Sequence, residues 1–268
     1  MKLRVFSASH NSHKYGVNCI ESVARQTFTP YEHYYIDDCS EDDTTKWIQQ
    51  SEEKILKIIN GRYNIDLRAV PADLKYNPEL RRYKLLNLYE YVTECDPEDV
   101  ICVLDGDDWL GTADALEKVA HQYLMNPSVK YVYTNWQYSH NNQLGISKPI
   151  PNNDWNPYKS SWITSAMSTF KVSEFLKIPI SNFLRWDYRW FTMGCDQAYV
   201  LPILWQIWKE EGNYDSVKFI NEPLYIYQFA ENPSKPRNDY DTASKNMRMD
   251  AHNSVDFIKK RGYVNWEY

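Results

Sequence analysis

A buried strand that ends in three carboxylates constrains this chain more than any other part of its sequence. The run Val100–Leu104 is continuously apolar, which indicates a strand buried on both faces, and Asp105, Asp107 and Asp108 follow it at once. Carboxylates this close repel one another, so they need solvent, protons or a cation. Open α/β sheets bind ligands at the carboxyl ends of their strands. The expected neutraliser is therefore a divalent cation such as Mg²⁺ or Mn²⁺, which prefers oxygen ligands and bridges carboxylates to phosphates.

An acidic turn is the alternative interpretation, with Gly106 as the turn residue and Asp108 as the cap of the next helix. A second acidic strand end favours a ligand site, because Asp37 and Asp38 follow the short strand signal at residues 34–36. Parallel strands end at the same edge, so both clusters are expected to meet there. The 8 glycines form no G-x-G-x-x-G or G-x-x-x-x-G-K-S/T loop, so we expect a metal rather than a glycine-rich loop to hold phosphates.

Strand and helix signals alternate along the first half of the chain, which predicts an α/β fold with a mostly parallel, Rossmann-like sheet flanked by helices. We expect strands at residues 3–8, 34–36, 65–70, 100–104 and 129–134, and helices at about 14–26, 42–59, 77–93 and 112–124, with Asn77 and Pro78 starting the third helix. The less regular second half predicts a loop at 144–163, a helix at about 198–211, strands at 216–220 and 224–229, and a closing helix at 239–261.

Composition restricts the partners and the compartment. The formal net charge is −6 and no dense Lys/Arg run is present, which argues against binding to a nucleic-acid backbone. The five cysteines are scattered, as in proteins of a reducing compartment. No signal peptide and no membrane-spanning apolar run are found, so a cytoplasmic location is expected. Aromatic residues make up 15%, which suits stacking on sugar rings; the candidates in the second half are Trp155, Trp162, Trp186 and Trp190.

Four segments, taken in order, resemble family 2 glycosyltransferases. They are Val5-Phe-Ser-Ala-Ser-His-Asn11, Cys19-Ile-Glu-Ser-Val-Ala-Arg-Gln-Thr-Phe28, Tyr35-Ile-Asp-Asp-Cys-Ser-Glu-Asp-Asp-Thr44 and Val103-Leu-Asp-Gly-Asp-Asp-Trp-Leu110. The last is similar to the D-x-D metal motif of that family. The resemblance implies the GT-A fold and transfer of a sugar, with inversion, from a nucleotide donor. It implies one domain over residues 1–268, with a nucleotide-sugar-binding half over about 1–135 and an acceptor-binding half over about 136–268 that includes the closing helix.

The resemblance also implies site residues. Nucleotide contacts fall to Ser9, His10, Asp38, Arg82, Asp105 and Gly106, and metal coordination to Asp105, Asp107 and Asp108. Asp38 is expected to bind the base, taken as uracil, and Asp107 to be the main metal ligand. The family's Ala-Arg-Asn helix motif is absent, so Arg82 fits a solvated helix charge equally well. Cys39 stands where the family has Gly or Asn, and it is expected to alter the turn.

An inverting transfer needs a group that takes the proton of the acceptor hydroxyl. The segment Gly194-Cys-Asp196 resembles the family's late acidic site at a helix start, which makes Asp196 the expected base. The other interpretation of Asp196 is a helix N-cap. Asp187 is the second candidate for the base, although the flanking Trp186 and Arg189 favour a structural ion pair there.

These inferences combine into a metal-dependent glycosyltransferase of the hexosyltransferase type. It would use Mn²⁺ or Mg²⁺ and a nucleotide sugar, with UDP as the expected nucleotide, and a hydroxyl of a glycan or other acceptor. One alternative is a nucleotidyltransferase that makes the nucleotide sugar, which would carry a Gly- and Arg/Lys-rich loop after the first strand. Another is a carbohydrate-binding protein without turnover. A nucleic-acid acceptor is disfavoured by charge, although residues 235–237, 248 and 259–261 offer local basic groups.

Overall fold

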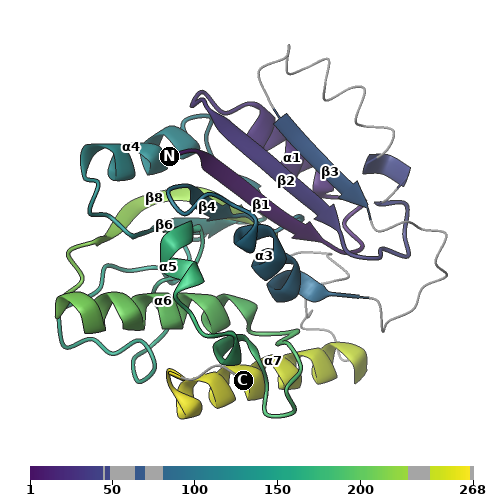
Figure 1. Ribbon diagram of the computed structural model, residues 1–268. Coiled ribbons are helices and arrows are strands. Elements are labelled where there is room, and N and C mark those ends of the chain that lie inside the picture. The colour runs from purple at the N-terminus through teal and green to yellow at the C-terminus, as the bar shows by residue number, and fades with distance from the viewer. Residues whose placement is uncertain (45, 49–63, 70–80, 229–241, 266–268) are drawn as a thin grey trace.

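A computed structural model describes residues 1–44, 46–48, 64–69, 81–228 and 242–265, and Figure 1 shows their arrangement. The described strands are β1 (Leu3–Ser9), β2 (Tyr31–Asp37), β3 (Asn64–Ala69), β4 (Val100–Val103), β5 (Trp109–Leu110), β6 (Tyr131–Tyr138), β7 (Ser168–Lys171) and β8 (Val217–Tyr227). The helices are α1 (Gly16–Ala24), α3 (Tyr83–Thr93), α4 (Ala115–Met125), α5 (Val172–Leu176), the 3-10 helix η2 (Ile180–Phe183), α6 (Cys195–Glu211) and α7 (Thr242–Arg261). Within these residues, no helix is both long and apolar enough to cross a lipid bilayer.

The strands form one mixed sheet in the order β3-β2-β1-β4-β7-β6-β8-β5. Strands β1 to β4 run parallel to one another, and β6 runs parallel to β8. Strand β7 is antiparallel to both β4 and β6, and β5 is antiparallel to β8. The predicted α/β fold with a mostly parallel sheet is confirmed, and β1, β2 and β4 all end at the same edge.

Alternate residues of the central strands enter two different cores. On β4, Ile101 and Val103 pack in a cluster with residues of α3, α5 and α6, whereas Val100 and Cys102 pack in a cluster with residues of α1 and α4. Figure 1 shows α3 in front of the sheet and α1 behind it. Because side chains alternate across a strand, burial on both faces requires the continuously apolar sequence from which this strand was predicted.

The second half of the chain differs most from the predicted elements. The two strands expected at 216–220 and 224–229 are one strand, β8, whose pairing with β6 shifts register between Thr134 and Trp136. Strand β7 and helix α5 were not predicted, because four and five residues are too few to produce a clear periodic signal. Most of the expected helix at 42–59, and the helix start at Asn77 and Pro78, lie outside the described residues.

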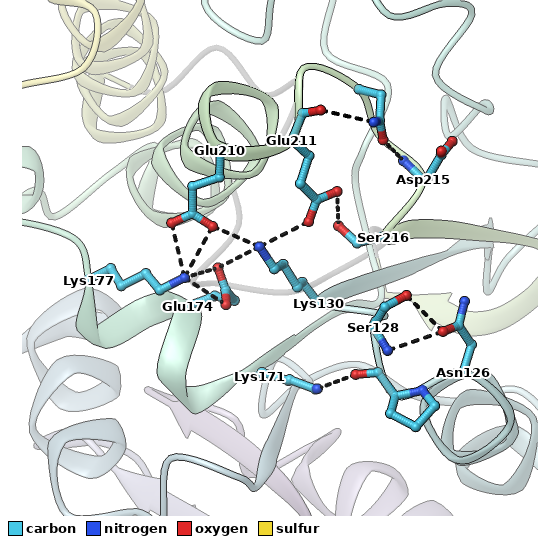
Figure 2. Close-up of polar contacts among 12 residues, drawn as sticks. Asn126, Ser128, Lys130, Lys171, Glu174, Lys177, Glu210, Glu211, Asp215 and Ser216 are labelled. Carbon is cyan, nitrogen blue, oxygen red and sulfur yellow. Dashed lines mark hydrogen bonds and ion pairs between the residues drawn. The ribbon is translucent and has the colours of Figure 1, made fainter.

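An ion network holds the carboxyl-terminal end of α6 against β6 and α5 (Figure 2). Lys130 Nζ lies 2.7 Å from Glu210 and 2.9 Å from Glu211, and Lys177 Nζ lies 3.0 Å from Glu174 and 3.1 Å from Glu210. Burial by itself lowers the pKa of Lys130, but hydrogen bonds to Glu210 and Glu211 more than reverse this, so its pKa is raised. Because α6 carries Asp196 at its other end, the network helps to place that residue.

Replacing Lys130 with methionine is expected to lower the free energy of unfolding by about 1–3 kcal/mol, because the carboxylates of α6 lose charged hydrogen bonds. Urea denaturation at pH 7 measures this change. Lys171→Met is the matched control, since Lys171 Nζ donates to the carbonyl oxygen of Pro127 outside the network, and it should cost less than about 1 kcal/mol. Equal losses in the two variants would contradict a special role of the network.

Candidate active site

Three parallel strand ends are joined at one corner of the sheet. The N–H of Asp38, just after β2, donates to the carbonyl oxygen of Ser9 at 2.8 Å. The N–H of Gly106, after β4, donates to the carbonyl oxygen of Ala8 at 3.0 Å. A Cβ on residue 106 would lie 2.5 Å from the Cβ of Ser9, so this close approach requires glycine. The two acidic loops therefore converge on the end of β1, as the parallel topology predicts.

The carboxylate of Asp38 is buried and accepts hydrogen bonds from the start of α3. It accepts the N–H groups of Arg82 at 3.0 Å and of Tyr83 at 2.8 Å, and Arg81 Nε lies 3.5 Å from it. The guanidinium of Arg81 also lies over the ring of Tyr83, 4.4 Å from its centroid. Arg81 lines the cleft beside Asp38, whereas the side chain of Arg82 pairs with Glu90. The arginine at this cleft is thus the neighbour of the one named from the sequence.

Cys39 adopts the conformation that glycine or asparagine would favour at this turn. Its φ is +60°, in the left-handed region. That conformation costs an ordinary L-residue roughly 1–2 kcal/mol. The turn therefore keeps a left-handed residue after Asp38, and the departure from the family pattern brings backbone strain at this position.

His10 presents a hydrogen-bond acceptor at the cleft. Its Nδ1 lies 3.0 Å from the carbonyl oxygen of Asp38, and because a carbonyl only accepts, Nδ1 carries the proton. Burial, and then the charge of Arg81, lower the pKa of His10, so the ring is neutral at pH 7. Nε2 is consequently the acceptor atom, suited to an N–H or O–H group of a ligand.

The three carboxylates after β4 lie in different surroundings. Asp108 is fully buried, and its carboxylate accepts the hydroxyl of Tyr225 and the N–H of Gln228, the latter at 2.7 Å. Burial and the nearby charges of Asp105 and Asp108 raise the pKa of Tyr225 well above its usual value, so Tyr225 remains a donor. Asp107 lines the cleft at 6% exposure, and Asp105 lies between this cleft and a second cavity.

Lys84 joins the acidic loop to helix α6. Its Nζ lies 2.6 Å from Asp105 Oδ1 and 2.7 Å from Asp196 Oδ1. The hydroxyl of Tyr199 donates to the same oxygen of Asp196 at 3.3 Å. Burial would lower the pKa of Lys84, but the charges of Asp105 and Asp196 raise it well above its usual value, so the ammonium stays charged. No sequence motif indicated Lys84.

Asp196 lies in the first turn of α6 but does not cap it. The N-cap is Gly194, with φ of +70°, and no side chain caps the helix. The side chain of Asp196 is 53% exposed, which leaves it accessible from the cleft. Asp187, by contrast, lies near Arg185 and Arg189 in a hairpin whose strands pair at Leu184 and Trp190, and it does not line the cleft.

One cleft therefore gathers most of the residues named from the sequence, together with two basic residues that were not. It is lined by Ala8, Ser9, His10, Ser12, Asp38, Arg81, Lys84, Asp105, Asp107, Thr192, Met193, Gly194, Cys195, Asp196 and Tyr227. Of the residues named from the sequence as contacts of the nucleotide or the metal, Arg82, Gly106 and Asp108 do not line it. Four carboxylates facing one cleft with two cations suit a ligand with several hydroxyl and phosphate oxygens.

Comparison with known proteins agrees with this arrangement. Residues 5–67 match the family model "Glycosyl transferase family 2". Among solved structures, TarS 1-349 of S. aureus in complex with UDP-GlcNAc is similar with a TM-score of 0.57 and 14% identity over 87% of this chain. The fold is that of the GT-A glycosyltransferases. The match of residues 5–67 to the family model confirms the resemblance to family 2 of these enzymes.

Two further GT-A structures extend the comparison. Glucosyl-3-phosphoglycerate synthase of Mycobacterium tuberculosis, in complex with Mn²⁺, UDP and phosphoglyceric acid, has a TM-score of 0.56 at 12% identity over 98% of this chain and 80% of its own. The mannosyltransferase PcManGT of Pyrobaculum calidifontis, in complex with GDP-Man and Mn²⁺, has a TM-score of 0.52 at 14% identity over 87% of this chain and 57% of its own. The chain spans 60% of TarS 1-349 and 37% of a longer TarS chain. No curated protein sequence matches this chain.

Replacing Asp108 with alanine should destabilise the fold by about 2–4 kcal/mol, because it leaves the hydroxyl of Tyr225 and the N–H of Gln228 buried without their acceptor. Asp107→Ala, at the neighbouring cleft-lining position, should lower the free energy of unfolding by less than Asp108→Ala does. Urea denaturation of both variants distinguishes the two roles. A larger loss for Asp107→Ala than for Asp108→Ala would reverse this assignment.

Proposed function

We propose that the protein is a metal-dependent, inverting glycosyltransferase that moves a sugar from a UDP-sugar to a hydroxyl of a glycan or another acceptor. The observation that carries this proposal is the convergence of Asp38, Asp105, Asp107 and Asp196 on one cleft. These carboxylates come from the ends of two parallel strands and from the start of α6. A glycosyltransferase binds a nucleotide diphosphate, its sugar and an acceptor hydroxyl at the same time, so it needs polar groups at all three of these positions.

The nucleotide would lie against Ser9, His10 and Asp38. Nε2 of neutral His10 and the carboxylate of Asp38 are acceptors, which suit the imide N–H of uracil and ribose hydroxyls. Arg81 supplies a charged donor on the same wall. Similar structures that contain UDP or GDP-Man support a nucleotide donor.

The residues present fit a hard divalent cation. Asp107 at the cleft and Asp105 beside it offer carboxylate oxygens of the kind that Mg²⁺ and Mn²⁺ prefer. Within the described residues no three His, Cys, Asp or Glu side chains form a complete cation site, so the donor phosphates and water would complete the coordination. When bound, such a cation would neutralise the diphosphate leaving group. We assign Asp107 as the main ligand and the buried Asp108 as the residue that positions the loop after β4.

Asp196 is the proposed general base. Lys84 and Tyr199 both contact its Oδ1, which orients the carboxylate and leaves Oδ2 as the atom to receive a proton. The acceptor oxygen would attack the anomeric carbon from the face opposite the diphosphate, and its proton would pass to Asp196 as the bond to the diphosphate breaks. Holding both groups in one cleft supplies the orientation that such a displacement needs.

Calorimetric titration of UDP, with and without Mn²⁺, tests the donor site. The wild-type protein should bind UDP in a Mn²⁺-dependent way, and Asp107→Ala should abolish the metal-dependent part because the main carboxylate ligand is lost. Asp215→Ala, at an exposed aspartate on the loop before β8, is the matched control and should bind as the wild type does. A parallel titration with GDP identifies the nucleotide. Absence of metal-dependent binding of both nucleotides to the wild type would overturn the proposal.

Asp196→Asn should lower the rate of UDP release from a UDP-sugar, in the presence of a panel of alkyl glycosides, by about 10²–10⁴-fold. Binding of Mn²⁺ and UDP should be retained, since the substitution removes proton acceptance and keeps the shape of the side chain. Asp187→Asn is the control, because Asp187 pairs with arginines outside the cleft, and its rate should stay within about threefold of the wild type. The opposite ranking would make Asp187 the base.

A further inference from the structure

A second cavity lies beyond the Lys84 bridge, and it has a different chemical character from the cleft. Its volume is about 290 Å³. It shares Lys84, Asp105, Asp196 and Tyr227 with the cleft, so the two spaces meet at the proposed reaction centre. This volume is near the lower end of the ~300–1,000 Å³ typical of small-molecule pockets, so it suits one ring rather than an extended ligand.

Five aromatic residues line this cavity. Trp136 and Tyr138 come from β6, Tyr225 and Tyr227 from β8, and Tyr199 from α6. The rings of Trp136 and Tyr138 are 4.9 Å apart at 77°, and those of Trp136 and Tyr227 are 5.3 Å apart at 58°, so these three rings pack against one another. Aromatic rings together with tyrosine and serine hydroxyls suit a ring that has apolar C–H faces and also carries hydroxyls.

The charges at the cavity disfavour an anion. Among the described residues that line it, Lys84 is the only basic one, and Lys84 is already in contact with the two carboxylates of Asp105 and Asp196. The lining therefore carries a formal charge of −1, and Ser165 and Ser168 add polar but uncharged groups. A carboxylate or phosphate placed here would lie close to Asp105 and Asp196, while Lys84 is paired with both and the proposed divalent cation is neutralised by the donor diphosphate.

We propose that this cavity binds one uncharged pyranose ring and excludes sugar acids and phosphorylated small molecules. The inference rests on the proposed function, and it specifies the substrate class for the same site. The ring could belong to the donor sugar or to the terminal sugar of the acceptor, since both have this chemistry. The tryptophans expected from the sequence to stack on a sugar do not line it; Trp155, Trp162 and Trp190 pack against the core, and Trp186 lies in the exposed hairpin.

Two binding experiments separate the donor from the acceptor as the source of the ring. In the donor arm, UDP, UDP-glucose, UDP-galactose, UDP-GlcNAc and UDP-glucuronate are titrated with Mn²⁺. If the donor sugar occupies the cavity, an uncharged UDP-sugar should bind at least about tenfold more tightly than UDP, and UDP-glucuronate about tenfold more weakly than UDP-glucose. In the acceptor arm, saturation-transfer NMR detects binding of the methyl β-glycosides of glucose, galactose and GlcNAc. The anionic probe is 3-phosphoglycerate. Each compound is measured with and without Mn²⁺ and UDP.

Variants test whether the sugar occupies this cavity. Ser165→Trp should fill the space and Tyr138→Ala should remove one ring of the wall, and both should lose the sugar-dependent binding while they retain binding of Mn²⁺ and UDP. Tyr188→Ala is the matched control, because Tyr188 is 65% exposed and lies outside the cavity. Retained binding of Mn²⁺ and UDP also shows that a variant is folded.

The possible results distinguish the cavity from the donor site. The inference is overturned if no uncharged sugar binds in either arm, if UDP-glucuronate or 3-phosphoglycerate binds as well as the uncharged sugars, or if both cavity variants keep sugar binding. In those cases Mn²⁺-dependent binding of UDP still supports a transferase. Absence of Mn²⁺-dependent binding of both UDP and GDP would overturn the proposed function, and this inference with it.

Discussion

The ammonium group of Lys84, held between Asp105 and Asp196, is the contact on which the geometry of the site depends. Two carboxylates that face the same narrow space repel each other unless a cation lies between them. Lys84 supplies that charge at 2.6 and 2.7 Å, and it thereby connects the loop after β4, the first turn of α3 and the first turn of α6. The nucleotide cleft and the aromatic cavity meet at this bridge, so one ion cluster defines the boundary between the two.

The position of this ion bridge depends on α3, which carries Lys84, and on α6, which carries Asp196. The carboxylate of Asp38 accepts two N–H groups at the start of α3, which holds that helix to the end of β2. Helix α6 is held at its opposite end by the network of Lys130 and Lys177 with three glutamates (Figure 2). Both helices also bury residues in the same hydrophobic cluster. Hydrogen bonds to Asp38, structural ion pairs and apolar packing thus fix the positions of both helices.

Much of the site was predictable because parallel strands end at a common edge. That rule placed Asp37 and Asp38 beside the acidic loop, and the resemblance added Ser9, His10 and Asp196. The sequence did not distinguish between neighbouring residues. Arg81 lines the cleft where Arg82 was named, and Asp108 is buried beside Asp107. Adjacent side chains at a helix start or in a tight turn point in different directions, and their directions follow from packing rather than from spacing. Lys84 belonged to no motif, so nothing in the sequence indicated its two contacts.

The sequence by itself determined the α/β architecture, the doubly buried strand, the acidic edge and the resemblance to family 2 glycosyltransferases. These features are local, because they depend on periodicity, on turn residues and on short motifs. Only the tertiary structure decided which carboxylates face the cleft, which arginine accompanies them, and which aromatic residues form the second cavity. The rings of β6 and β8 meet there because those strands pair, and Lys84 reaches Asp196 because α3 and α6 pack on the same face of the sheet. Such contacts join segments far apart in the chain, so no local pattern encodes them.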